Sequence, residues 1–284
     1  MPPRKSPTVR QKRLGAELRK LREAEGLTFE AAAAVLECGK AKISRIETGV
    51  NGIRPVDLRV LLKAYGVQDE ALTEALLGMA REGRTKGWWN RYGDVLSDGF
   101  TDLAEMESKA VALHSWETTL VPGLLQTADY MRVLFRRGRL DVADEELEHH
   151  VAGRMHRQLA LDRDNAPQLW AVIYEPVLQA KFGGPSVMRD QLLHLARMAQ
   201  RDHITIQVLP YTTESHRGVN GSFTIVNTPP PGMDVVRADT IATSLYIEED
   251  AQVRAYRQVF DQLRAAALGP TPSLELIRSS AERL

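Results

Sequence analysis

The fold of the first part of this chain is decided by residues 28–49, which read TFEAAAAVLECGKAKISRIETG. The Thr28 hydroxyl can accept a hydrogen bond from a first-turn N–H, so it predicts a helix over residues 29–36. Residues 37–39, Glu-Cys-Gly, break that helix, and a second helix is expected over residues 40–48. The spacing of the two helices predicts a helix-turn-helix.

Each expected helix has a small or apolar buried side. Ala32 or Ala33 supplies the small residue where the helices cross, and Ile43 and Ile46 lie three residues apart on the buried side of the second helix. A helix of this kind lies in the major groove, where Lys or Arg can reach guanine and an alanine can meet a thymine methyl. The candidate DNA-binding residues are Thr28, Lys40, Ala41, Lys42, Ser44, Arg45 and Arg54.

Arg45 and Lys40 are the expected base readers; the alternative is an ordinary helical hairpin whose cations form a solvated face. Three flanking features favour the DNA-reading interpretation. Gly49 can end the second helix, Pro55 can open another, and both flanking helices carry apolar stripes. The stripe residues are Leu14, Leu18, Leu21, Leu58, Leu61, Leu62 and Tyr65. A fifth helix is expected over residues 70–81.

The first part of the chain is basic although the whole chain is neutral. Residues 1–56 hold twelve Lys and Arg against six Asp and Glu, a net charge of +6, so the remainder carries −6. This asymmetry is typical of phosphate binding, although it can also reflect solubility alone. Residues 1–12 contain three prolines and lack apolar periodicity. We expect a mobile basic arm that follows a phosphate backbone or enters a minor groove, or that merely frays.

Length and composition predict two domains in a reducing compartment. A chain of 284 residues can bury two cores, and its single cysteine, Cys38, excludes an internal disulfide. No apolar run approaches membrane-spanning length, so no membrane partner is expected and the protein is predicted to be cytoplasmic, or nucleoid-associated when bound to DNA. The expected parts are a mobile arm (1–12), a helix-turn-helix domain (13–80), a linker (81–87) and a second domain (88–284).

The second domain reads as α+β, with a small sheet packed by helices. Helices are expected over 102–117, with a buried face of Leu103, Met106, Ala110 and Leu113, and after the Pro122-Gly123 turn, where Thr127 can cap. Further helices are expected over 143–161, 187–200 and 251–267, and strands over 168–175, 204–210, 222–228, 233–238 and 244–249. The fold class is therefore mainly α with a smaller β component.

Candidate ligand- or partner-binding residues in the second domain are Trp88, Trp89, Tyr92, Gln126, Arg154, Gln158, Tyr174 and Glu175. The aromatic group favours core anchoring, with a partner surface or lid as the alternative. Gln126 is expected to bond backbone groups beside the turn. Arg154, Gln158, Tyr174 and Glu175 are a candidate polar cleft, although pairing of the arginines with glutamates of their own helix explains the charges more simply.

Neither a metal site, a cofactor nor a catalytic residue is expected. The adjacent histidines, His149 and His150, point to different sides of a helix, and no HExxH spacing occurs. The sequence lacks a phosphate-cradling glycine loop, a nucleophile elbow and paired cysteines. The protein is therefore predicted not to be an enzyme, and a buried carboxylate or histidine of strongly perturbed pKa in a cleft would reopen that question.

Six downstream segments carry a resemblance to a known family: KGWWNRYGD (86–94), VPGLLQTADY (121–130), RMHRQ (154–158), YEPVL (174–178), VLP (208–210) and GSF (221–223). The first part of the chain resembles the xenobiotic-response-element regulators, which have a lambda-repressor-like fold of about five helices. The remainder resembles the C-terminal domain of the actinomycete WhiJ-like regulators. This resemblance implies transcriptional control of development or secondary metabolism, and a C-terminal domain without established chemistry.

The helix-turn-helix motif predicts double-stranded DNA with a near-palindromic operator and a second copy of the chain as partners. The resemblance implies a further partner, a small companion protein that binds the second domain as its signal. The alternative signal is a small metabolite in an apolar pocket. The chain departs from the family pattern at Phe29, where relatives carry a phosphate-contacting glutamine, at Gly39, a capping position, and at Arg237-Ala238-Asp239, where an apolar or aromatic strand ending in glutamate is expected.

Overall fold

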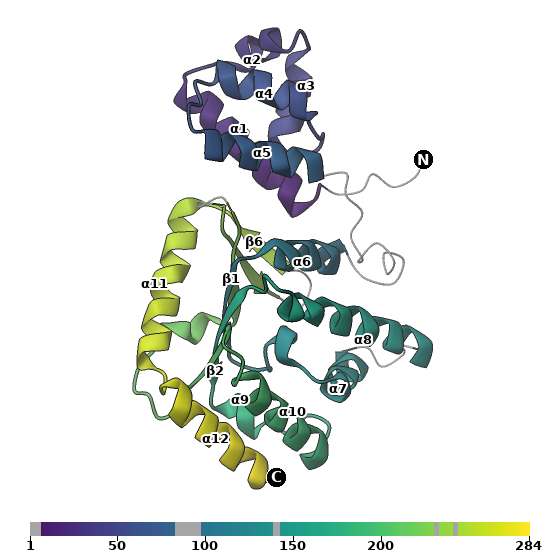
Figure 1. The fold of residues 1–284 in the computed structure, drawn as a ribbon, viewed down its shortest axis with the longest axis vertical. Coiled ribbons are helices and arrows are strands. Elements are labelled where there is room, and N and C mark those ends of the chain that lie inside the picture. Colours follow the sequence, from purple (N-terminus) through teal and green to yellow (C-terminus); the bar gives the residue numbers. More distant parts are fainter. Residues whose placement is uncertain (1–6, 83–97, 139–142, 230–232, 241–243) are drawn as a thin grey trace. The chain divides into compact units, whose positions relative to one another are not determined.

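The computed structural model describes residues 7–82, 98–138, 143–229, 233–240 and 244–284. The chain divides into two compact units, residues 1–87 and 88–284. Each unit is described by itself below (Figure 1). The expected class, mainly helical with a smaller β component, is confirmed.

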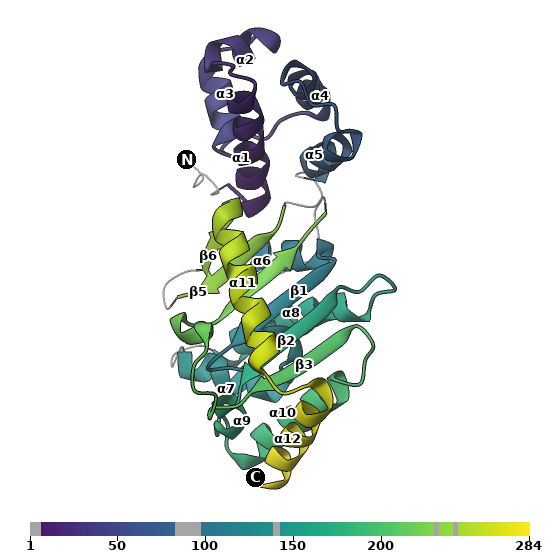
Figure 2. The same cartoon turned by 90° about the vertical axis from the view of Figure 1, so that its left-hand side faces the viewer.

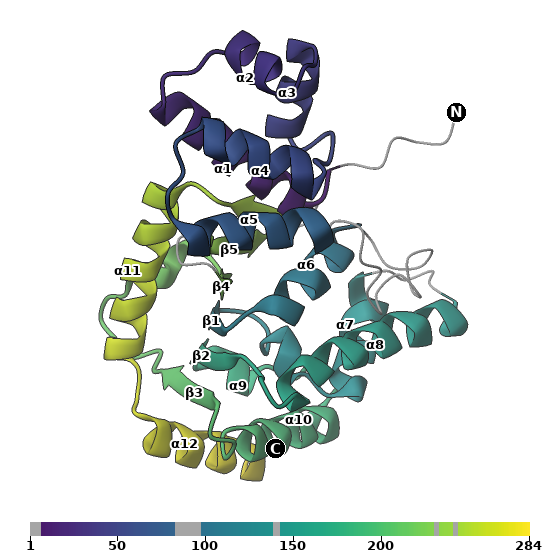
Figure 3. The same cartoon turned by 45° about the horizontal axis from the view of Figure 1, so that its top comes forward.

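The first unit contains five described helices: α1 (Val9–Ala24), α2 (Phe29–Val35), α3 (Lys40–Glu47), α4 (Pro55–Ala64) and α5 (Glu70–Glu82). Their apolar stripes meet in one core, which includes Leu18, Ile43, Leu58 and Leu76, each at most 1% exposed. The α2–α3 pair lies side by side in Figures 1 and 3. This helix-turn-helix arrangement is the one predicted.

Helix α1 begins earlier than expected, so residues 9–12 are not part of an extended arm. Thr8 caps the helix by accepting a hydrogen bond from the Gln11 N–H at 3.2 Å. The Gln11 side chain accepts in return from the Thr8 N–H at 3.0 Å. This reciprocal capping box satisfies two N–H groups that would otherwise lack partners. The sequence signal for it, Thr-x-x-Gln, precedes the first apolar residue of the stripe.

The second unit is built around a six-stranded mixed sheet in the order β3-β2-β1-β4-β5-β6. Strands β1, β2 and β3 are parallel, and β4, β5 and β6 continue the sheet with antiparallel pairs. The strands are β1 (Ala112–Glu117), β2 (Gln168–Tyr174), β3 (Ile204–Leu209), β4 (Phe223–Asn227), β5 (Val235–Asp239) and β6 (Ser244–Ile247).

Helices cover both faces of this sheet. The α-helices of the second unit are α6 (Asp98–Lys109), α7 (Ala128–Gly138), α8 (Asp144–Gln158), α9 (Pro176–Gln179), α10 (Pro185–Met198), α11 (Asp250–Ala266) and α12 (Pro270–Glu282), and the 3-10 turns are η2 (Gly123–Leu125), η3 (Leu159–Asp162) and η4 (Arg217–Asn220). Helix α11 lies on one face, and α6, α7, α8 and α10 lie on the other (Figures 1 and 3). Each face has its own apolar cluster, centred on Trp116 and Phe260 on the α11 side and on Leu125 and Leu192 on the other.

The prediction of one helix over residues 102–117 is wrong in its second half. Helix α6 ends at Lys109, and residues 112–117 form β1, the strand between β2 and β4. From Ala112 the side chains alternate between the two faces of the sheet, as Leu113 and Trp116 show by joining different clusters. Alanines and glutamates upstream dominate the helical pattern, whereas pairing on both sides decides the conformation of a central strand.

The edge strand β3 is closed by a segment that the sequence analysis did not assign. The Val208 N–H donates to the Ser273 hydroxyl at 2.9 Å, and the Leu268 N–H donates to the Val208 carbonyl at 2.9 Å. Helix α12 starts beside this edge and packs on α10, as Figure 2 shows. The outward backbone groups of β3 at Val208 are therefore already bonded.

Candidate nucleic-acid interface

The cap and the crossing of the helix-turn-helix are as the sequence indicates. The Ala31 N–H donates to the Thr28 hydroxyl at 3.1 Å, which starts α2. Ala32 and Ala33 are buried, at 0% and 4% exposure, where α2 meets α3. Since neither side chain extends past Cβ, the two helix backbones can approach closely.

The turn between the two helices contains a strained residue that sequence reasoning missed. Glu37 has a φ of 49°, in the left-handed region that a non-glycine residue rarely adopts. Helix α3 then starts at Lys40, and its N-cap residue, Gly39, makes no side-chain hydrogen bond. The direction of α3 thus depends on tertiary contacts more than on its own cap.

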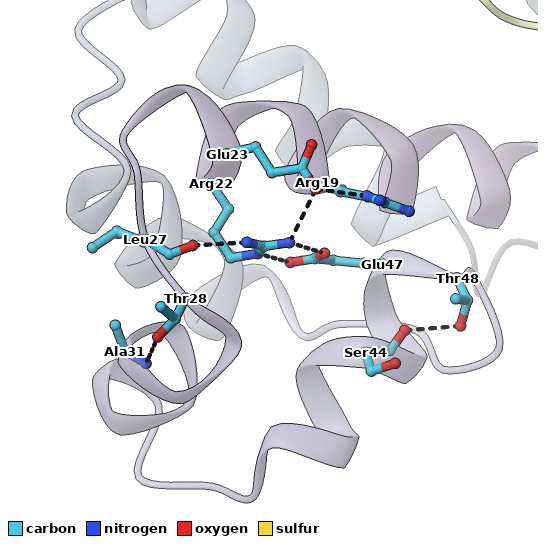
Figure 4. Close-up of polar contacts among 9 residues, drawn as sticks. All are labelled: Arg19, Arg22, Glu23, Leu27, Thr28, Ala31, Ser44, Glu47 and Thr48. Atoms are coloured by element: carbon cyan, nitrogen blue, oxygen red, sulfur yellow. Dashed lines mark hydrogen bonds and ion pairs between the residues drawn. The ribbon is translucent and has the colours of Figure 1, made fainter.

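A buried ion pair joins α3 to α1 (Figure 4). Arg22 donates from Nε to Glu47 Oε1 at 2.7 Å and from Nη2 to Glu47 Oε2 at 3.0 Å, and its Nη1 donates to the Leu27 carbonyl at 2.7 Å. The Arg22 and Glu47 side chains are only 6% and 3% exposed. The hydrogen bonds that Arg22 donates to Glu47, together with the charge of that carboxylate, raise the pKa of the Arg22 guanidinium.

Close backbone contacts also hold α1 against α3. A Cβ on Gly15 would lie 2.5 Å from the carbonyl oxygens of Ile46 and Glu47. Gly49, with a φ of 74°, follows the helical region, and a Cβ on it would lie 2.7 Å from the Lys12 backbone nitrogen. Only glycine fits at Gly15 without moving α3, and the sequence analysis did not single it out.

The predicted reader positions all lie on the exposed side of α3. Ile43 and Ile46 face the core, at 1% and 3% exposure, and the side chains that remain outward are those of Lys40, Ala41, Lys42, Ser44 and Arg45. On the same unit, the hydroxyl of Thr48 donates back to the Ser44 carbonyl at 2.8 Å and finishes the helix (Figure 4). Helix α3 therefore presents a continuous polar face.

The cations among the predicted DNA-binding residues differ in their partners. Lys40 pairs with Glu30 at 3.2 Å, and Arg54 makes two hydrogen bonds to Asp57, at 3.0 and 2.8 Å. Within the described ranges, the Arg45 side chain has no hydrogen bond or ion pair. Arg45 can therefore bind DNA without first breaking a hydrogen bond or an ion pair within the described ranges. The Phe29 ring lies beneath the Arg22 guanidinium, with 4.2 Å between the ring centroid and Cζ.

In the second unit the structure brings together only part of the predicted set. Trp88, Trp89 and Tyr92 lie outside the described residues. Gln126 donates from Nε2 to the Val121 carbonyl at 2.7 Å, which is the backbone role expected for it. Gln158 donates to the Gln126 carbonyl at 2.7 Å, and Arg154 Nη1 lies 3.5 Å from Gln126 Oε1.

The other two members of the proposed cleft lie elsewhere. Tyr174 packs on the α11 side of the sheet, with ring centroids 6.1 Å from Trp116 and 5.3 Å from His216. Glu175 accepts from the Tyr211 N–H at 3.0 Å. Since β2 alternates, Tyr174 cannot share a face with residues that contact Arg154, and the four-residue cleft does not form.

The expected pairing within α8 is also wrong for the arginines. Arg157 pairs with Glu107 of α6 at 2.8 Å, and Arg154 lies 4.5 Å over the Phe135 ring of α7. The α8 carboxylate of Glu148 instead binds Arg132 of α7 at 2.7 Å. The basic side chains of α8 therefore point inward, toward a cavity that also contains polar residues of the sheet.

No helix among the described residues is long and apolar enough to cross a membrane. No group of three or more of their His, Cys, Asp or Glu side chains is arranged to hold a metal ion.

The fold and the exposed face of α3 define a helix-turn-helix protein with a second, α+β domain. Residues 13–76 match the family described as helix-turn-helix domain, which supports a DNA-binding regulator. Residues 100–279 match the family described as "Domain of unknown function (DUF5753)", and the chain belongs to that family. No curated protein and no solved structure gives a significant match.

Proposed function

We propose that this protein is a sequence-specific transcriptional regulator that reads DNA with α3 and receives a signal through its second domain. The observation that carries the proposal is the outward face of α3, which presents Lys40, Lys42 and Arg45 while α1 holds the helix through Arg22 and Glu47. Thr28, Ala41, Ser44 and Arg54 complete the proposed contact surface. A rigid helix with exposed cations is what major-groove reading requires.

Capture of genomic fragments by the full-length protein at physiological salt tests this proposal. The wild type should enrich a short inverted repeat, and Lys40→Ala/Arg45→Ala should lose it. The matched control is Arg59→Ala/Lys63→Ala, which removes two exposed positive charges from α4 of the same unit. The control separates base reading from net charge, since non-specific binding follows the number of neutralised phosphates.

Equal, salt-sensitive capture by all three proteins would contradict sequence-specific binding. It would leave a basic protein that binds the DNA backbone without reading bases. A repeat that both double variants lose equally would place the reading surface outside α3.

We also propose that the protein binds its operator as a homodimer. Two reader helices about one helical turn apart would engage the two halves of a near-palindromic site. Light scattering of the complex should give twice the 31.7 kDa chain mass plus the mass of the bound DNA fragment. A monomer, both free and on DNA, contradicts this part of the proposal.

The signal has two candidate sources. The sequence resemblance favours a small companion protein, while the polar cavity beside α8 favours a small molecule. A stoichiometric partner band that co-purifies with the protein from its own cells would support the first source. Stabilisation of the purified protein by a low-molecular-weight extract would support the second.

We propose that the second domain binds its signal without converting it. The sequence lacks nucleophile and phosphate-loop motifs, which supports this role. One observation favours catalysis instead: burial raises the pKa of Glu117, which lines the cavity, to about 7. Recovery of a bound small molecule unchanged after prolonged incubation supports binding alone, and its chemical conversion would show an enzyme.

A further inference from the structure

The cavity of the second unit has a volume of about 410 Å³, which falls within the range of small-molecule sites. Its walls come from α6, β1, the loop 118–124, α8, β4 and β5, which are far apart in the sequence. The space lies on the face of the sheet opposite α11, since Leu113 and Leu169 line it. Unlike the apolar pocket that the sequence analysis considered, this cavity is lined by charged side chains.

Three guanidinium groups line the cavity at different depths. Arg157 is the deepest, with 8% of its side chain exposed, and it pairs with the equally buried Glu107. Arg237 pairs at 2.6 Å with Asp239, whose side chain is 54% exposed, so this pair is at the open side. Arg154 lies on the cavity wall and has no carboxylate partner among the described residues.

Several enclosed N–H groups in this cavity have no acceptor. The Nε atoms of Arg154, Arg157 and Arg237 are shielded from solvent and make no hydrogen bond within the described part of the chain. The Arg157–Glu107 pair is close enough for an ion pair but is not aligned as a hydrogen bond. Leaving a buried donor unsatisfied costs free energy, so an acceptor that reaches these guanidinium groups would stabilise the protein.

The charges of the lining also favour an acceptor-rich ligand. With Arg157 and Arg237 paired, Arg154 is the cation left over. The remaining carboxyl is Glu117, and its enclosure raises its pKa to about 7. At and below neutral pH the cavity therefore carries excess positive charge around Arg154.

The loop of the sequence motif VPGLLQTADY fixes the arginines in place. The Gln158 amide donates to the carbonyls of Gly123 and Gln126, at 3.2 and 2.7 Å, and so joins the loop to α8. A Cβ on Gly123 would lie 2.5 Å from Arg157 Nη2, so the guanidinium packs directly on the loop backbone. The cavity is thus built by preorganised groups, which lowers the entropy cost of binding.

We propose that this cavity binds a small molecule bearing a carboxylate or phosphate group, with Arg154 as its main charged partner and Arg157 and Arg237 beside it. Guanidinium forks match both groups in geometry. The inference deepens the proposed function, on which it rests for its effect on DNA binding. The binding itself is measured without DNA.

The test is the thermal stability of the full-length protein in inorganic phosphate, succinate or citrate, against sodium chloride of equal ionic strength. We expect saturable stabilisation by at least one of these anions. Arg154→Gln should lower the affinity for that anion about tenfold or more, because the substitution removes a charged hydrogen-bond donor. The matched control is Arg254→Gln, an exposed arginine of α11 on the other face, which should bind as the wild type does.

A second variant, Glu117→Gln, tests the proposal even if Arg154→Gln fails to fold. The groups that face Glu117 are Arg237 and Asp239 of β5, Ser115 of β1, Ser222 beside β4 and Tyr130 of α7. Removing the negative charge with Glu117→Gln should tighten anion binding about tenfold relative to the wild type at pH 8. At pH 6 the variant and the wild type should bind almost equally, because Glu117 of the wild type is then largely protonated.

Saturable stabilisation by phosphate alone, by the carboxylates alone or by both identifies the anionic group that the cavity binds and supports the proposal. The proposal is overturned if none of the three anions stabilises the protein more than sodium chloride does. It is also overturned if the wild type, Arg154→Gln and Glu117→Gln bind the anion with equal affinity. The Lys40→Ala/Arg45→Ala variant should bind the anion normally, so failure of DNA reading cannot be mistaken for failure of the cavity.

Discussion

At the residue scale, Arg45 differs from Lys40 and Arg54 in having no carboxylate partner among the described residues. We predict that Arg45→Ala weakens binding to the cognate site by about 1–3 kcal/mol if Arg45 contacts guanine with two hydrogen bonds. Titrations on cognate and random DNA at one salt concentration measure this difference. Equal losses on both DNAs would show that Arg45 contacts only phosphate.

The buried pair of Arg22 and Glu47 predicts a large effect on stability. Glu47→Gln removes the buried carboxylate and leaves the Arg22 guanidinium only the half-exposed Glu23 carboxylate, 3.5 Å from its Nη2. It should therefore lower the free energy of unfolding by roughly 3 kcal/mol, the low end for a broken buried pair. Replacing both residues together, as Arg22→Met/Glu47→Leu, should recover most of that loss because no charge remains buried. Chemical denaturation of each variant measures these values, and a double variant no better than Glu47→Gln would contradict the explanation.

Glu117 predicts a pH dependence of stability. Its pKa is about 7 in the folded protein against 4.5 in the unfolded chain, so the folded state binds more protons between these values. Stability therefore falls as pH rises from about 4.5 to about 7, by an amount of the order of 3 kcal/mol. Glu117→Gln should remove this fall and be the more stable protein at pH 8. Unfolding curves at pH 5 and pH 8 test it, and parallel pH profiles would refute it.

At the scale of elements, most helices and strands could be predicted because their signals are local. The Thr28 cap, the β-rich runs of β2 to β6 and the Thr127 cap, which accepts from the Tyr130 N–H at 3.3 Å, all lie within a few residues of the element they start. Strand β1 was missed because its conformation depends on two neighbouring strands. The cavity was missed because Arg157, Glu107 and Arg237 meet only through the tertiary fold.

Replacing a glycine by alanine should have opposite effects on stability at the α1–α3 contact and on the open side of α5. Gly15→Ala places a methyl group 2.5 Å from two backbone carbonyls of α3, so it should destabilise the first unit and weaken DNA binding. Gly78→Ala in α5 meets nothing within 4 Å and should stabilise by about 0.5–1 kcal/mol through helix propensity. Thermal unfolding and DNA titration of both variants test this. Similar effects of the two substitutions would show that the α1–α3 spacing is adjustable.

At the scale of the whole molecule, two compact units with separate cores predict substitution effects that stay within one unit. In calorimetry of the full chain, Arg22→Met/Glu47→Leu should move only the transition of the first unit, and Glu117→Gln only that of the second. Isolated residues 1–87 and 88–284 identify which transition is which. A single transition moved equally by both variants would show that the units unfold together.

The hydrogen bonds of Ser273 and Leu268 to β3 bear on whether copies of this protein can pair through that edge strand. An open edge strand is a template on which a strand of another chain can pair. Here the C-terminal segment occupies that template with bonds from its own chain. At Val208 the C-terminal segment therefore leaves neither the N–H nor the C=O of this edge strand free to pair with another copy, whether or not a signal or an operator is bound.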